Sequence, residues 1–171
     1  MSSVTDLFGD NPSLAEARQY VFDNLERGVQ CPCCDKHAAV DWRPFNPNMA
    51  RALIWLVLEA GPEMRSVLVP EGAPRWLTAT NQLPTTAHWG LIEKPPRDPR
   101  LKKQKRSGWW KPTAKGVDFV YRHCRIKMKA GIYNHKVVGW SAEETDIVEA
   151  LAGEHDYQDL MLGHFPFVED E

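Results

Sequence analysis

The segment from His88 to Val120 reads HWGLIEKPPRDPRLKKQKRSGWWKPTAKGVDFV and decides the fold that we expect. It contains, in order, an apolar helix end, a basic loop, a strand and the beginning of another helix. The helix end carries Trp89, Leu91 and Ile92, whose apolar side chains can hold it against a core. We therefore expect a helix followed by a β-hairpin with a basic tip.

The tip of this hairpin carries four basic side chains, namely Lys102, Lys103, Lys105 and Arg106. The chain then returns through a strand at 108–111. Pro112 and Thr113 suit the start of the next helix, where threonine caps free N–H groups. Lysine and arginine on such a hairpin suit the phosphates of a nucleic-acid backbone. The segment therefore indicates a nucleic-acid-binding protein.

Charge is distributed unevenly along the chain. Residues 94–129 carry thirteen basic and two acidic side chains, whereas residues 141–171 carry ten acidic and no basic side chains. The formal net charge of −2 therefore hides two opposing blocks. The electrostatic field of such a charge distribution attracts an anionic polymer to the basic end, and the attraction weakens with added salt. The alternative is a solvated basic face balanced by an acidic one.

Length and composition set broad limits. With 171 residues, 43% of them hydrophobic, the chain can bury one core, and we expect one compact domain with appendages. The longest uncharged apolar run, Ala52–Leu58, has seven residues and is too short to span a bilayer. The first eleven residues lack the basic start and apolar core of a secretory signal. We therefore expect a cytoplasmic protein with no membrane partner.

An N-terminal helix is predicted over residues 14–27. Ser13 and Glu16 have the spacing of a capping box, and Gly28 is suited to end the helix. Its apolar stripe would consist of Leu14, Ala17, Val21 and Leu25. A second helix begins near Asn48 and ends before Gly61; because its centre is apolar on all sides, we expect it to be the first core helix.

Prolines divide the region that follows into short elements. Residues 66–69 suit a strand and residues 75–80 a short helix, while Pro84 can occupy the first turn of a third helix. This third helix would end at Trp89. The polar residues nearest a nucleic-acid groove would be Asn81, Gln82, Thr85, Thr86 and His88. Such side chains hydrogen-bond base edges, but they are also ordinary turn and capping residues.

Beyond the basic loop, the pattern predicts a short helix at 117–121 and a strand at 125–129. Asn134 and His135 suit the turn of a hairpin, whose arms are residues 132–133 and 136–138. Ser141 and Glu144 have capping-box spacing, which predicts a helix that runs to Leu151. Residues 156–162 then form an acidic helical turn or two, and a loose tail is predicted over 165–171.

Three of the four cysteines lie in the run Cys31-Pro32-Cys33-Cys34. Adjacent cysteines pair badly with each other, so this run favours a metal site in a reducing compartment over a disulfide framework. Cys31 and Cys34 have the CPxC spacing of a zinc knuckle, with Cys33 or His37 as a local third ligand. Ligands from the later hairpin would be His123, Cys124 or His135. The alternative is a cluster of free thiols.

No catalytic motif is visible in the sequence. It lacks a phosphate-cradling glycine loop, a nucleophile elbow and an HExxH motif, and His155 and His164 lie among acids as ordinary surface residues do. A thioredoxin-like pattern around the cysteines is also missing. We therefore expect that the protein is not an enzyme. Trp109 and Trp110 are neighbours on a strand and face opposite ways, so we expect only one to be buried.

Residues 90–94 and 108–116 resemble the end of the recognition helix, the wing and the following helix of winged-helix regulators. The resemblance covers residues 48–122 and implies an α+β fold with a winged helix-turn-helix core. It also implies DNA binding through the wing. The resemblance places Trp109 and Lys111 at the DNA surface. The four basic residues of the hairpin tip would lie there too, together with Thr85, Thr86 and His88.

The whole chain also resembles small uncharacterised proteins of phages and prophages. The motifs that carry this resemblance are Cys31–Cys34, Met49–Leu53, Trp89–Ile92, Ala150–Leu151 and Asp156–Met161. It implies a phage-encoded protein in the host cytoplasm and supplies no activity.

We accordingly predict three regions: residues 1–46 with the N-terminal helix and a structural zinc site, residues 47–123 with the winged helix, and residues 124–171 with the hairpin and acidic helix. The predicted function is transcription regulation through duplex DNA binding. The alternative is a protein-interaction module, or an inhibitor of a host protein/nucleic-acid machine, that acts through the wing or the acidic segment. A homodimer in which the acidic segment covers the wing is also left open.

Overall fold

The computed structural model describes residues 9, 12–100 and 105–166. The fold is mixed α+β with several small sheets, which confirms the predicted class at this level. Across the described ranges, no helix is long and apolar enough to cross a membrane.

The chain forms two compact units. The first consists of residues 1–43 and 131–139, and the second of residues 44–130 and 140–171. The hairpin around residues 134–135 belongs to the first unit, with the N-terminal segment. Each unit is described separately below.

In the first unit, α2 (Leu14–Asp23) begins at the predicted capping box. The Glu16 backbone N–H donates to Ser13 Oγ, and the Ser13 backbone N–H donates to the Glu16 carboxylate at 2.9 Å. The helix ends before the predicted Arg27, because the chain passes into turns that lead to Gly28, whose φ is +75°. The predicted stripe is correct except at Leu14, which is 60% exposed.

Strands β1 (Val29–Gln30) and β2 (His37–Ala38) form an antiparallel hairpin beside α2. Val21, Leu25, Val29 and Ala38 form the core of this unit. The turn that joins the two strands contains the cysteine run.

A three-stranded sheet has the order β3 (Asp41–Pro44), β8 (Lys129–Tyr133), β9 (Lys136–Trp140). The boundary between the two units falls within these strands. Asn134 and His135 form the turn between β8 and β9 with φ values of 49° and 62°, which confirms the predicted hairpin.

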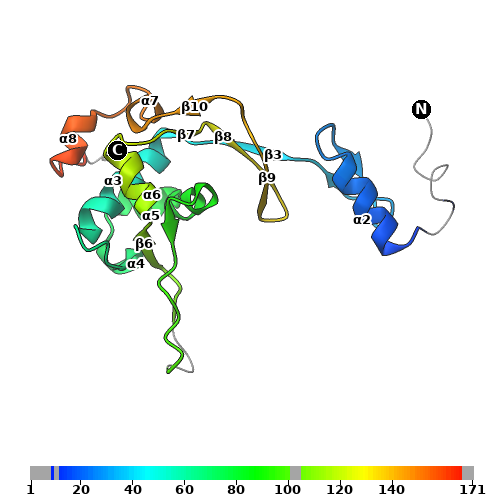
Figure 1. Ribbon diagram of the computed structural model, residues 1–171, viewed down its shortest axis with the longest axis horizontal. Coiled ribbons are helices and arrows are strands. Elements are labelled where there is room, and N and C mark those ends of the chain that lie inside the picture. Colours follow the sequence, from blue (N-terminus) through cyan, green and yellow to red (C-terminus); the bar gives the residue numbers. More distant parts are fainter. Residues whose placement is uncertain (1–8, 10–11, 101–104, 167–171) are drawn as a thin grey trace. The chain divides into compact units, whose positions relative to one another are not determined.

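The second unit is built around α3 (Pro47–Ala60). Asn46 caps this helix, since its side chain accepts a hydrogen bond from the Met49 N–H at 2.9 Å, and Gly61 ends it at a φ of +70°. Every residue from Met49 to Val57 is buried, so the prediction of a core helix is confirmed. Figure 1 shows α3 beside α6 (Ala114–Val120), with which it is in contact.

Short elements follow α3: β4 (Val67–Leu68), α4 (Val69–Gly72), α5 (Arg75–Thr80), the 3-10 helix η1 (Leu83–Trp89), β5 (Ile92–Glu93) and β6 (Trp109–Pro112). The strand, the short helix and the third helical segment expected between residues 66 and 89 are among them, whereas α4 was not predicted. The antiparallel sheet has the order β4-β6-β5, with Val67 opposite Trp110 and Ile92 opposite Pro112. Trp89 is 2% exposed, and its indole N–H donates to the Lys127 carbonyl at 2.7 Å.

The remaining elements are β7 (Ile126–Lys127), β10 (Glu144–Thr145), α7 (Ile147–Ala150) and α8 (Tyr157–Met161). The prediction that a helix begins at Ser141 was wrong. Ser141 Oγ instead accepts from the Lys129 N–H at 2.9 Å, and β10 pairs with β7. Asp146 and Glu149 form the capping box of the shorter helix α7. The helix predicted at 117–121 begins earlier, because Thr113 caps α6 as expected.

The acidic C-terminal segment is packed into the second unit. Ile147, Leu151 and Leu160 are each at most 1% exposed, and α7 and α8 both contact α3. The tail predicted to be loose is packed at its start, where the Phe165 ring stacks on Trp76 with centroids 5.8 Å apart. Residues 167–171 lie outside the described residues.

Candidate functional site

The basic loop is the connection between β5 and β6, residues 94–108. Its described arms extend away from the helices of the second unit (Figure 1). Lys102 and Lys103 lie outside the described residues, whereas Arg97, Arg100 and Lys105 are exposed. The Arg100 guanidinium donates to the Asp98 carboxylate at 3.1 Å and lowers the pKa of that carboxyl.

Two cations fasten the base of this loop. Arg106 is half-buried, and its Nε–H donates to the Pro95 carbonyl at 2.9 Å. Lys94 Nζ donates to the Arg106 carbonyl at 3.1 Å and lies 4.0 Å from the centre of the Trp110 ring. These contacts join the two arms, so Arg106 has a structural role beside the phosphate role predicted for it.

The neighbouring strand residues are less exposed than expected. Trp109 and Trp110 are both half-buried, so neither of them is fully buried. Lys111 Nζ lies 3.8 Å from the Glu93 carboxylate, and its side chain is only 25% exposed. An interaction of Lys111 with phosphate therefore competes with this ion pair.

The polar residues of η1 divide into two groups. Thr86 is fully buried, and its hydroxyl donates to the Leu83 carbonyl at 2.7 Å, so its assignment to the DNA surface was wrong. Thr85 and His88 are half-buried. Gln82 serves the fold, since its side chain donates to the Thr80 carbonyl and accepts from Asn46.

The third-helix segment η1 and the base of the loop lie side by side. Both line a cavity of about 410 Å³, with Leu83 and Pro84 from η1 and Lys94 and Trp110 from the two arms of the hairpin. A single surface can therefore bring η1 and the loop to one ligand.

The cysteine run forms a tight turn between β1 and β2. The Cys31 N–H donates to the Lys36 carbonyl and the Asp35 N–H to the Cys31 carbonyl, both at 2.9 Å. Asp35 takes a left-handed φ of 57° to close the turn. The pKa of the Cys31 thiol is lowered because the backbone N–H groups of Cys33 and Cys34 donate hydrogen bonds to its sulfur, with a smaller contribution from the Cys34 thiol.

Of the other expected metal ligands, His37 lies next to Gly28 and Cys124 belongs to the second unit. The His37 imidazole packs against Gly28, where an added Cβ would lie 2.9 Å from His37 Cε1. Cys124 is half-buried in the second unit, and burial raises the pKa of its thiol. Within the part of the chain that the structure describes, no group of three or more metal-ligating side chains could hold an ion. All four cysteines are free thiols.

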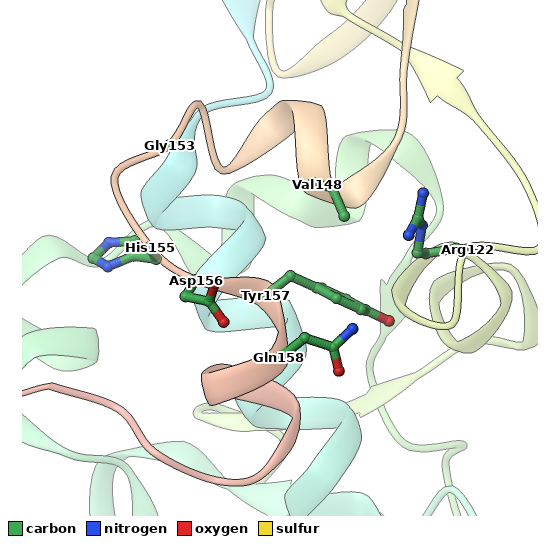
Figure 2. A pocket seen from close by; sticks show the side chains of 7 residues that line it. All are labelled: Arg122, Val148, Gly153, His155, Asp156, Tyr157 and Gln158. Carbon is green, nitrogen blue, oxygen red and sulfur yellow. The ribbon is translucent and has the colours of Figure 1, made fainter.

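A pocket of about 420 Å³ lies beside α8 and is lined in part by Arg122, His155, Asp156 and Tyr157. Figure 2 shows His155 and Arg122 on opposite sides of it, with the Tyr157 ring between them. The Tyr157 hydroxyl donates to the Val120 carbonyl at 2.7 Å, and burial raises its pKa. The titratable groups therefore do not converge on one point, as an acid–base pair would require.

One buried cation was not singled out from the sequence. Arg51 lies on α3 at 3% exposure, with its guanidinium 3.7 Å from the centre of the Trp76 ring. It donates to the Pro166 carbonyl, but within the described residues its Nε and the Trp76 indole N–H have no hydrogen-bond partner. Burial lowers the Arg51 pKa. The signal available in the sequence was an arginine inside an otherwise apolar helix.

Comparisons with models of protein families, with curated proteins and with solved structures found no significant match to this chain. The functional argument therefore rests on the residues and their geometry.

Proposed function

We propose that the protein binds duplex DNA through the β5–β6 loop, as a phage-encoded regulator of the winged-helix type in the host cytoplasm. The observation that carries this proposal is a basic loop at the end of the β4-β6-β5 sheet, beside η1. Compared with a winged-helix domain, η1 takes the place of the recognition helix and the β5–β6 loop takes the place of the wing.

The charge of the loop supports contact with phosphates. Residues 94–108 contain seven basic side chains and one acidic side chain. Each phosphate that a cation neutralises releases counterions, which makes binding strongly salt-dependent. Because Arg106 and Lys94 also fasten the base of the loop, the exposed cations nearer its tip are the ones we expect to contact DNA.

The geometry favours backbone contact over base reading. Thr86 is buried, and Thr85 and His88 are only half-exposed, so η1 offers few polar groups to base edges. We therefore expect weak sequence preference and an affinity that depends mainly on salt.

Fluorescence anisotropy with a labelled random duplex at several salt concentrations tests this proposal. The variant K102A/K103A/K105A removes three loop lysines and keeps the Arg106 contacts. The control R18A/R27A/K136A removes three exposed cations from the first unit. If all three loop lysines contact phosphates, the slope of log affinity against log salt should become shallower by about 2.7 in the loop variant only.

Two results would overturn the proposal: no binding by the unmodified protein at low salt, or equal salt slopes for the loop variant and the control. The first result would favour a protein-interaction module, and a pull-down from host lysate would then be the next experiment.

A further inference from the structure

The turn at residues 31–36 holds two thiols in an arrangement suited to a metal ion. Two backbone hydrogen bonds close the turn, one from the Cys31 N–H to the Lys36 carbonyl and one from the Asp35 N–H to the Cys31 carbonyl. The Cys34 side chain lies next to the Cys31 sulfur. A CPxC turn between two paired strands can present its first and last cysteine to one metal ion, as zinc knuckles do.

Within the part of the chain that the structure describes, a thiolate metal site is incomplete. Zinc in structural sites takes four ligands in a tetrahedron. Cys31 and Cys34 supply two, and the His37 imidazole lies next to Gly28. Among the described residues, no third ligand lies close enough to complete a group of three.

The turn is open to a second molecule. Cys33 and Cys34 are exposed, and so are their neighbours Asp35 and Lys36. A second copy of the chain carries the same two-thiol turn, so two copies together supply four sulfur ligands in the number that zinc requires.

We propose that Cys31 and Cys34 form a half-site for a zinc ion, and that the same two cysteines of a second copy complete it. Each Zn–S bond forms as a thiol releases its proton to the solvent, and no electrons are transferred. The ion thereby joins two chains through their first units. This proposal does not depend on DNA binding, because the basic loop belongs to the other unit.

Cobalt titration of the reduced, metal-free full-length chain tests the half-site, because tetrahedral Co²⁺ bound to thiolates absorbs visible light. We expect the absorption to saturate at about half an equivalent of Co²⁺ per chain, since one ion serves two copies. Light scattering with Zn²⁺ should show the mass of a dimer, and removal of the ion with a chelator should restore the monomer.

Single-serine variants identify the ligands. C31S and C34S should each abolish both the absorption and the dimer. The matched control is C124S, which removes a half-buried thiol of the second unit and should leave both signals unchanged. C33S should also keep both signals, because Cys33 is not one of the two proposed ligands.

Three outcomes would overturn the proposal. Saturation at one equivalent with a monomeric mass would place a complete site within one chain. Loss of the signal in C33S would make Cys33 a ligand. An absence of thiolate absorption at saturating Co²⁺ would leave the run as free thiols. Circular dichroism of each variant verifies that a lost signal is not caused by unfolding.

Discussion

Arg51 shows how one residue joins segments that are far apart in the sequence. It lies on α3, contacts Trp76 of α5 and donates to the carbonyl of Pro166. No carboxylate of the described residues pairs with it, and burial lowers its pKa. Because a buried charge without a counter-charge is costly, most of the benefit of this side chain should come from packing.

Two substitutions of Arg51 separate packing from charge. Arg51→Ala leaves a cavity and should cost about 2–5 kcal/mol of unfolding free energy, as other large-to-small core changes do. Arg51→Met keeps much of the volume and removes the charge, so it should cost less than about 1.5 kcal/mol. Urea denaturation measures both. A methionine variant as unstable as the alanine variant would show that the guanidinium contacts dominate.

His155 makes stability depend on pH. Burial lowers its pKa, Arg51 lowers it further, and Glu154 opposes the shift. In the unfolded chain its pKa is about 6.5. The unfolded state therefore takes up more protons as the pH falls below this value, so the folded protein loses stability until the lower folded-state pKa is passed.

His155→Gln should reduce this loss. Urea denaturation at pH 7.5, 6.5 and 5.5 (about one unit above, at and one unit below the unfolded-state pKa) measures the effect, with His164→Gln as a control that removes an exposed histidine. The prediction is that only His155→Gln flattens the decline in unfolding free energy. An equal decline in the unmodified protein and His155→Gln would contradict it.

At the scale of elements, α6 closely approaches the backbone of the residue that precedes β5. A Cβ added to Gly116 would lie 2.0 Å from the backbone carbonyl oxygen of Leu91, and backbone cannot move aside cheaply. Gly116→Ala should therefore destabilise the protein by about 3 kcal/mol or more. Gly72 lies in α4 with no atom within 4 Å of an added Cβ, so Gly72→Ala should change stability by less than about 1 kcal/mol. Equal urea midpoints for the two variants would refute this close contact.

Local signals predicted the bounds of several helices. The bounds predicted for α5 agree with the structure, and the Asn48 start and Gly61 end predicted for α3 agree closely. The spacing of serine and glutamate failed once: Ser13 and Glu16 begin a helix, whereas Ser141 and Glu144 do not. The difference is non-local, since residues 144–145 pair with β7, and no pattern within the segment itself reveals that partner.

Contacts between residues that are far apart in the sequence also limit what can be predicted about the candidate site. The basic loop could be predicted because its cations lie close together in the sequence. The burial of Thr86 could not, because it depends on a 3-10 turn that aims its hydroxyl at the Leu83 carbonyl. The role of Arg51 depends on Pro166, which is 115 positions away in the chain.

At the scale of the whole molecule, the acidic segment cannot be treated as a removable appendage. Deletion of residues 141–171 would remove Ile147, Leu151 and Leu160 from the core of the second unit, so this truncation should unfold it. A test of whether acidic charge restrains DNA binding must therefore change charge and keep the fold.

The variant E143Q/E154Q/D159N should remove acidic charge and keep the fold. These three side chains are exposed, and no ion pair of the described residues involves them. If the acidic block opposes DNA approach, this variant should bind a random duplex several-fold more tightly at low salt, because three negative charges are lost. The gain should disappear near physiological ionic strength, where charges more than about 8 Å apart are screened. Anisotropy at both salt concentrations measures it. Equal affinity at low salt would show that the basic loop acts independently of the acidic block, and a gain that persists at high salt would indicate direct contact between the block and the DNA-binding surface.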